Sequence, residues 1–443
     1  MSAPSDRSSL AQPVLLAILL ALCCAFLYAA KIQLGYSADG AYAFSRVLEA
    51  KTCYLPIWSR AHADCILQLP LVLAVQGGIT DFPSLSAFYH VGLFLPFLLS
   101  FALCWFACRP ARNNVLLLFP LVSYILVSLA AASHLSGQGQ VLAVFAWPVL
   151  FLLLRPDWTR LDAVLLLLLL LLLCRVYEAY LPSGLLYLAL VVRRLRFAQA
   201  GERSALIIAL VLVLVGLGIA GYMAVFPSSV RNRHDFIVGM VREVPRHPLL
   251  LISLAAVLAL AAALYVPRRR VLLVLPLLFG LGSIGLSAAG RIATAGTSFN
   301  SRSLTGTLLP LLLLTAVVVQ RRQVHLESRS WFLAGATLVA LIAGYVVSWS
   351  AWRDFRKDFV TVLESRTGYV PVSETIVARN GQRWLWTTPL LSILWAPSCV
   401  RTILEGTWPG WRPFDPRDSL PLQNRVRYHE AFFAASPKAL HCR

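Results

Sequence analysis

A series of long apolar runs, separated by short segments that contain arginine, is the sequence feature that most constrains the fold. About 17 to 25 apolar residues in a helix cross the hydrocarbon core of a bilayer. With 58% apolar and only 13% charged residues, the chain belongs to the membrane class. Several middle runs are short for a full crossing, so tilting or a shifted boundary is expected there. We predict an all-α polytopic membrane protein with about eleven transmembrane helices, at about 13–30, 86–107, 114–132, 140–154, 161–175, 181–192, 204–226, 249–266, 271–289, 304–320 and 330–350.

In the loops that separate these spans, most of the arginines fall on one side. The positive-inside rule makes that side cytoplasmic and places the N-terminus there as well. An odd number of spans then puts residues 31–85, a long first outer loop, and residues 351–443, a small domain or cap, on the far side of a transmembrane domain formed by residues 1–350. The cytoplasmic arginines are Arg7, Arg109, Arg112, Arg155, Arg160, Arg193, Arg194, Arg196, Arg203, Arg268, Arg269, Arg270, Arg321, Arg322 and Arg329.

The net charge of +19 would suggest nucleic acid in a soluble protein. Here the basic residues lie between apolar runs, where they meet lipid headgroups, so we expect membrane lipids and no nucleic acid as partners. No CxxC, histidine cluster or other metal-ligand spacing occurs, and no metal site is predicted. The two outer segments each hold two cysteines, Cys53 with Cys65 and Cys399 with Cys442. Two disulfides are expected there, with a pairing that the sequence does not determine.

The stretch after the first span, residues 35–50, is where chemistry could take place. Asp39 lies among small residues that leave its carboxylate uncovered, which suggests a general base at the membrane surface. The alternative is that Ser37 and Asp39 cap a helix. The segment that follows reads as a short amphipathic helix, because its polar residues recur at helical spacing: Tyr42, Ser45, Arg46 and Glu49.

The outer side carries more arginine than orientation requires. Charge at membrane depth is costly and usually functional, so we expect an anionic partner such as a lipid-linked phosphate. The alternative is contact with ordinary headgroups, or pairing with Asp64, Asp81, Asp235 and Glu243. The outer arginines are Arg46, Arg60, Arg175, Arg231, Arg233, Arg242, Arg246, Arg291 and Arg302.

Three outer segments supply candidate ligands. The Gly-, Ser- and Thr-rich loop 290–302 contains Arg291 and leads to Arg302 at the start of a helix, where the helix dipole also favours an anion, so Arg302 is the first choice for a phosphate ligand. In the turn between the fifth and sixth spans, Arg175 and Glu178 are three residues apart, which suits a structural ion pair or a sugar-binding site. His134 lies in a polar turn that could bind hydroxyl groups or have no such role.

Five tryptophans crowd the C-terminal tail. Their faces could stack on sugar rings, but tryptophan is also the usual interfacial anchor of membrane proteins. Anchoring or core packing is expected for most, with a sugar-facing role for one or two. They are Trp384, Trp386, Trp395, Trp408 and Trp411.

This layout resembles the C-type (GT-C) membrane glycosyltransferases over about the first 350 residues. The resemblance rests on the many spans, on Asp39 just after the first helix, on Arg302 with Pro310 following it, and on an outer C-terminal region. It implies a bacterial inner-membrane enzyme that takes a sugar from a polyprenyl-phosphate donor, with the first-loop carboxylate as base. The first loop lacks an acidic DxD or ExD pair, so a divalent metal is not implied and no cofactor beyond the lipid-linked donor is expected.

More narrowly, the lone Asp39, the turn from Arg175 to Glu178 and the segment Trp384 to Pro389 look like bacterial arabinofuranosyltransferases. The acceptor implied is periplasmic: a surface glycan, a lipid-linked glycan or a pilin-type protein. In this interpretation Asp39 deprotonates the acceptor hydroxyl while Arg302 and neighbouring arginines, with Arg46 among them, bind the phosphate. A polysaccharide polymerase or ligase acting on lipid diphosphates would keep the same arginines. A secondary transporter would need charges within the spans and an internal repeat, and neither is seen in the sequence.

Overall fold

The computed structural model describes residues 10–37, 40–55, 57–108, 114–129, 137–226, 304–323, 326, 328–380, 388–395 and 402–405. These residues are mostly helical. Each predicted span that falls within them overlaps a helix, and the spans predicted at 249–266 and 271–289 lie outside them. Four helices are long and apolar enough to cross a membrane: Ala11–Lys31, Phe82–Cys108, Gly201–Met223 and Ser328–Ser365. The described residues are thus mostly helical and contain four candidate membrane-spanning helices, as expected of a polytopic membrane protein.

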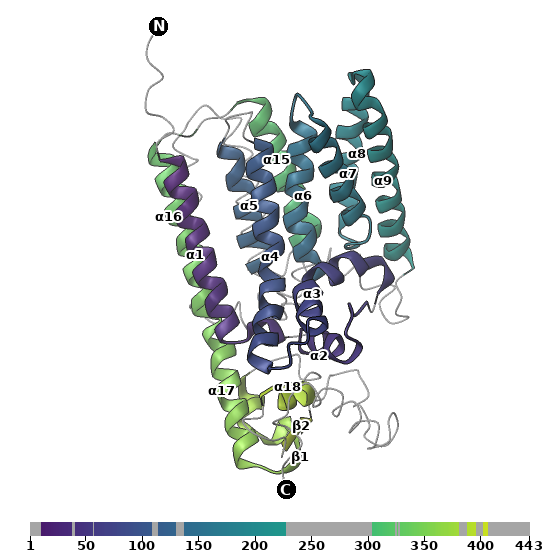
Figure 1. The fold of residues 1–443 in the computed structure, drawn as a ribbon. Helices are drawn as coiled ribbons and strands as arrows, with labels where there is room; N and C mark the ends of the chain where they lie inside the picture. Colours follow the sequence, from purple (N-terminus) through teal and green to yellow (C-terminus); the bar gives the residue numbers. More distant parts are fainter. Residues whose placement is uncertain are drawn as a thin grey trace.

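The apolar helices pack side by side as a bundle whose members mostly alternate in direction (Figure 1). α1 and α16 are in contact and run in the same direction. Gly335, early in α16, lies against Val14, early in α1. Just after α16, the Trp352 indole donates to the Ile32 carbonyl, just after α1. The helices of the bundle are α1 (Ala11–Lys31), α4 (Phe82–Cys108), η4 (Asn114–Leu117), α5 (Leu118–Ser123), the π-helix η5 (Tyr124–Leu129), α6 (Gln138–Leu154), α7 (Arg160–Leu173), α8 (Tyr180–Arg196), α9 (Ala200–Val225), the π-helix η9 (Leu304–Leu308), α15 (Leu309–Arg321) and α16 (Ser328–Ser348).

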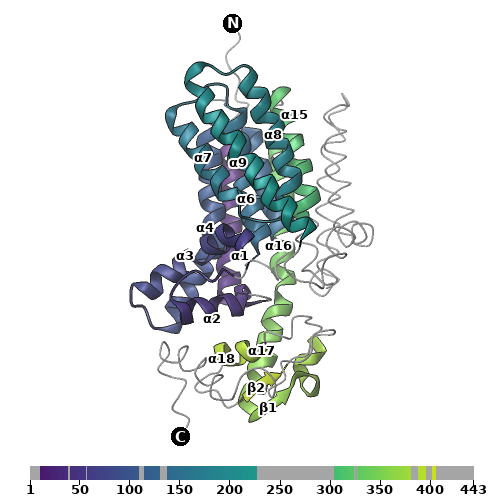
Figure 2. The same ribbon diagram turned by 90° about the vertical axis from the view of Figure 1, so that its right-hand side faces the viewer.

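The two ends of the bundle differ in what they carry (Figures 1 and 2). One end holds the C-termini of α6, α8 and α15 and so the arginines at 155, 193, 194, 196 and 321. The other end holds two helices of the first loop, α2 (Gly40–Ala50) and α3 (Ala61–Gln76), together with the C-terminal region. We call these the arginine-rich end and the α2–α3 end.

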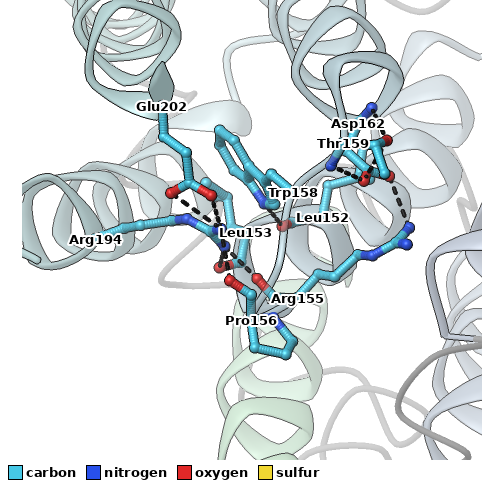
Figure 3. Close-up of polar contacts among 9 residues, drawn as sticks. All are labelled: Leu152, Leu153, Arg155, Pro156, Trp158, Thr159, Asp162, Arg194 and Glu202. Carbon is cyan, nitrogen blue, oxygen red and sulfur yellow. Dashed lines mark hydrogen bonds and ion pairs between the residues drawn. The ribbon is translucent and has the colours of Figure 1, made fainter. Parts of the chain in front are cut away.

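At the arginine-rich end, Arg194 of α8 closes the C-terminus of α6 (Figure 3). The last carbonyls of a helix have no partner within it, and here the guanidinium supplies the missing donors. Arg194 donates to the carbonyl oxygens of Leu153 at 3.3 Å and Pro156 at 3.0 Å, and also to that of Arg155. Its guanidinium lies 3.9 Å from the centre of the Trp158 ring and pairs with Glu202 at 3.3 Å.

The start of α7 is fixed beside it. Thr159 and Asp162 form a capping box, in which Asp162 Oδ2 accepts from the Thr159 backbone N–H at 2.7 Å. Asp162 is fully buried and its other oxygen accepts from Arg155 at 2.7 Å. Polar groups of the two loops are thus paired with one another at this end, which sets the register of α6, α7 and α8.

Replacing Arg194 with Ala is expected to weaken this end, since it leaves several helix-end carbonyls without donors. Hydrogen bonds that involve a charged group each contribute about 1.5 to 3 kcal/mol, so thermal unfolding in detergent should shift down by several degrees. Arg353→Ala, which removes an exposed arginine paired with its neighbour Asp354, serves as the control. Equal shifts for the two variants would contradict the role given to Arg194.

The C-terminal region begins with α17 (Ser350–Ser365), which follows α16 after a single residue. One face of α17 is buried through Trp352, Phe355 and Phe359, and the Trp395 ring packs on all three with centroids 5.5, 6.1 and 5.2 Å away. Core packing, predicted for most of the tail tryptophans, is confirmed for Trp395; the other four lie outside the described residues. The remaining elements are β1 (Gly368–Pro371), η10 (Val372–Glu374), η11 (Ile376–Asn380), α18 (Thr388–Trp395) and β2 (Thr402–Glu405), with β1 and β2 paired in parallel.

This region is tied to the end of α1. The Trp352 indole donates to the Ile32 carbonyl at 3.2 Å, and the Trp395 indole donates to Gln33 Oε1 at 2.7 Å. Arg356 reaches the Lys31 carbonyl at 3.4 Å. The C-terminal region therefore packs beside the turn that leads from α1 into the first loop.

Candidate functional site

The turn between α1 and α2 contains the predicted base. A short 3-10 helix, η1 (Leu34–Tyr36), follows α1, and α2 begins at Gly40. Asp39 itself lies outside the described residues, but both of its described neighbours, Ser37 and Gly40, are buried. The amphipathic helix predicted after Asp39 is confirmed, with boundaries at Gly40 and Ala50.

A cluster of buried aromatic side chains packs against this turn. The rings of Tyr36 and Tyr89 stack with centroids 5.7 Å apart, and Phe44 packs edge-on against both. Tyr89 Oη donates to the Gly40 carbonyl at 3.1 Å. A Cβ at Gly40 would lie 1.8 Å from the Gly35 carbonyl oxygen, so only glycine fits this close approach. The backbone on both sides of Asp39 is therefore fixed by packing.

The first loop is cross-linked to α3. Cys53 and Cys65 form a disulfide, and the Gln68 amide bridges both backbone groups of Tyr54 at 2.7 and 3.1 Å. The disulfide predicted in this loop is confirmed, and its pairing is now defined. Cys399 and Cys442 lie outside the described residues. The cross-links connect the end of α2 to α3 and so make the loop one packed unit.

Arg46, a predicted substrate ligand, lies on α2 among local partners. Its guanidinium pairs with Glu49 at 2.8 Å and donates to Tyr42 Oη at 2.9 Å. It also lies 5.1 Å and 5.9 Å from the ring centres of Tyr42 and Tyr54. An anionic substrate would have to share this arginine with Glu49.

Glu178 pairs with an arginine that the sequence spacing did not indicate. Its Oε1 accepts from Arg60 Nε at 3.2 Å, and from Nη2 of the same guanidinium, which lies 5.1 Å from the centre of the Tyr177 ring. Arg60 ends η2 (Trp58–Arg60) in the first loop. Both side chains are buried.

Of the two alternatives for Arg175 and Glu178, the ion pair is therefore wrong, and the sugar-binding site stays a prediction. A spacing of three residues brings side chains together only on a helix, and here α7 ends at Leu173 and α8 begins at Tyr180. The two residues lie in the turn between these helices. Arg60 was counted among the outer arginines, but nothing in the sequence indicated a partner 118 residues away.

Arg175 contacts a backbone carbonyl and an aromatic ring, and not a carboxylate. Its Nε donates to the Trp58 carbonyl at 2.7 Å, and the guanidinium lies 5.5 Å from the centre of the Trp58 ring. Among the described residues it has no acidic partner. The side chain is half-buried, so part of a fixed, charged guanidinium stays accessible to an anion.

The remaining predicted ligands, Arg302, Arg291 and His134, lie outside the described residues. Leu304, two residues after Arg302, begins η9, which contacts α8 and η5. η9 leads into α15, which ends at Arg321 at the arginine-rich end, so η9 lies toward the opposite end of the bundle. Arg175 and Glu178 thus lie in one turn between α7 and α8, whereas Arg46 lies apart from them on α2.

No protein-family model matches this chain, and comparisons with characterised proteins and with solved structures find no match.

Proposed function

We propose that the protein is a membrane glycosyltransferase of the C-type fold, which moves a sugar from a polyprenyl-phosphate donor to an acceptor outside the cytoplasm. The observation that carries the proposal is the state of Arg175: a half-buried guanidinium at the end of a span, fixed by Trp58, with no acidic partner among the described residues. Such a group suits a lipid-borne phosphate that reaches it from the membrane.

The reaction needs a base and a stabilised leaving group. Asp39 takes the proton from the acceptor hydroxyl as its oxygen attacks the anomeric carbon. The bond from that carbon to the phosphate oxygen breaks, and the electron pair leaves with the polyprenyl phosphate. Arg175 and Arg302 stabilise the phosphate, and preorganised charge of this kind is usually the largest contribution to catalysis. A positioned base typically adds about 10²- to 10⁴-fold.

The placement of flanking residues supports a shared site. Ser37 and Gly40, on either side of Asp39, belong to the first loop, and Arg175 donates to the Trp58 carbonyl of the same loop, whose helices define the α2–α3 end. In the proposal this end faces the periplasm and the arginine-rich end faces the cytoplasm of a bacterial inner membrane, as the positive-inside rule implies. The acceptor is then a surface glycan, a lipid-linked glycan or a pilin-type protein, and arabinofuranose is the sugar that the narrower resemblance suggests.

The test uses purified full-length protein and a polyprenyl-phosphate sugar. Arg175→Ala should raise the KM for the donor about 10- to 100-fold, since one hydrogen-bonded charge is worth about 1.5 to 3 kcal/mol. Arg175→Lys keeps the charge but loses the two guanidinium N–H groups that donate to the Trp58 carbonyl. Its KM for the donor should therefore lie between the values of the native protein and Arg175→Ala. Lys357→Ala, which removes an exposed cation on α17, is the control and should leave KM unchanged. An unaltered KM in Arg175→Ala would remove this residue from the donor site.

A further inference from the structure

α7 is too short to cross the membrane alone. It has 14 residues, about 21 Å at 1.5 Å per residue, whereas the hydrocarbon core is about 30 Å thick. One stripe of the helix is exposed through Leu161, Val164, Leu168 and Leu171, which is the face that meets lipid. At the end away from the arginine-rich loops, roughly 9 Å of hydrocarbon is left for another segment to cover.

The segment that lies against this end of α7 is η2 with the first turn of α3. His62 Nδ1 lies 3.1 Å from the Leu172 carbonyl, and the His62 backbone N–H donates to the Arg175 carbonyl at 3.2 Å. Figures 1 and 2 show α3 next to the lower part of α4 and below α7. The Arg60–Glu178 pair closes the same junction. α3 therefore continues from where α7 stops.

The depth of α3 follows from its packing on α4. A Cβ at Gly92 would lie 2.2 Å from the Leu67 carbonyl oxygen, so the two backbones touch there. Gly92 is 16 residues before Cys108, the end of α4 at the arginine-rich end, or about 24 Å along the helix, which is inside a core of about 30 Å. On the same scale Leu69 lies at about 27 Å, still inside the core, and Leu73 lies near its boundary.

The outward face of α3 is apolar. Trp58, Leu69 and Leu73 are 50%, 45% and 59% exposed, and Leu171 at the end of α7 is 50% exposed. Leu69 and Leu73 are four residues apart, so they share one face of the helix. The charged residues of the segment, Arg60 and Asp64, are turned inward and buried. A segment embedded in lipid is expected to bury its charged side chains against the protein and to expose its leucines, as this segment does.

We infer that α3 is embedded in the membrane, and that the face formed by Trp58, Leu69 and Leu73 contacts the acyl chains of the leaflet at the α2–α3 end. This face of α3 continues the lipid-facing stripe of α7 across the part of the hydrocarbon core that α7 is too short to span. This inference concerns the fold in its bilayer and holds whichever reaction the protein performs.

Photo-crosslinking in a bilayer tests it. A diazirine amino acid replaces Leu69 in the full chain, which is reconstituted into vesicles of phosphatidylcholine and phosphatidylglycerol, and peptide mass spectrometry measures phospholipid adducts. Leu168, on the exposed stripe of α7, is the positive control and Lys357, on the exposed face of α17, is the negative one. The adduct yield at Leu69 should match that at Leu168 and exceed that at Lys357 at least tenfold.

Two results would overturn the inference. A yield at Leu69 as low as that at Lys357 would place the face in water, and crosslinks to a second copy of the chain would mean that protein covers it. The same probe at Leu73 gives an independent reading near the boundary. Both side chains point outward, so neither replacement disturbs the core, and size-exclusion chromatography before reconstitution selects folded protein.

Discussion

Asp39→Asn is expected to leave the protein folded and inserted while sugar transfer falls at least 10²- to 10⁴-fold, the usual contribution of a positioned base. Asparagine has the same shape as aspartate but takes no proton from the acceptor hydroxyl. The measurement is the rate at which labelled sugar moves from a polyprenyl-phosphate donor to acceptor, with purified protein at matched concentration. The variant also separates the two interpretations of Asp39, because asparagine caps helices as well as aspartate.

Asp81→Asn is the matched control. Asp81 is exposed just before α4, at the same end of the bundle, and its carboxylate accepts from the Ser84 backbone N–H at 2.9 Å. Hydrogen bonds from Ser84 lower the pKa of Asp81, so it is charged at neutral pH and the substitution removes the same charge. Its activity should stay near that of the native protein. Near-native transfer by Asp39→Asn would leave Asp39 with a capping role only.

Glu178→Ala is expected to be among the most destabilising single changes in the described part of the chain. It strands the buried guanidinium of Arg60, and removing one partner of a buried pair costs about 3 to 5 kcal/mol. Glu49→Ala breaks the half-exposed pair with Arg46 and should cost only about 0.3 to 0.5 kcal/mol. Unfolding in detergent, followed by intrinsic fluorescence, compares the two variants directly.

A double variant separates burial from other effects. Arg60→Met combined with Glu178→Leu removes both charges and fills their space, so it should recover most of the stability that Glu178→Ala loses. If Glu178→Ala proves as mild as Glu49→Ala, the Arg60–Glu178 pair does not hold the junction of α3 with α7. The role of Glu178 in binding substrate stays a prediction alongside this structural one.

Much of the fold follows from local pattern. Apolar run length predicted the helices of the bundle within the described residues, because a bilayer requires such runs and little else. The polar spacing from Tyr42 to Glu49 predicted α2, and two cysteines sharing one loop predicted the disulfide between Cys53 and Cys65. Each of these signals is read over fewer than about twenty-five consecutive residues.

What was missed depends on contacts between distant segments. α3, a helix of 16 residues, lies within residues 31–85, which the sequence predicts as the first outer loop, and no local pattern indicates which helices it packs against. Its place becomes clear only from its packing on α4 and α7. The ion-pair alternative for Arg175 and Glu178 fails for the same reason: a spacing of three residues pairs side chains only on a helix, and α7 ends before Arg175. The sequence predicts roles for Asp39 and Arg302, and the structure describes only their neighbours.

The most direct measurement is the release of polyprenyl phosphate. Native protein in lipid nanodiscs is incubated with a panel of polyprenyl-phosphate sugars and candidate acceptors, and the freed lipid phosphate is followed over time. We predict release from one donor of the panel, dependent on acceptor, with no release by Asp39→Asn. No release from any donor, together with consumption of a lipid diphosphate in a parallel incubation, would contradict the proposed reaction.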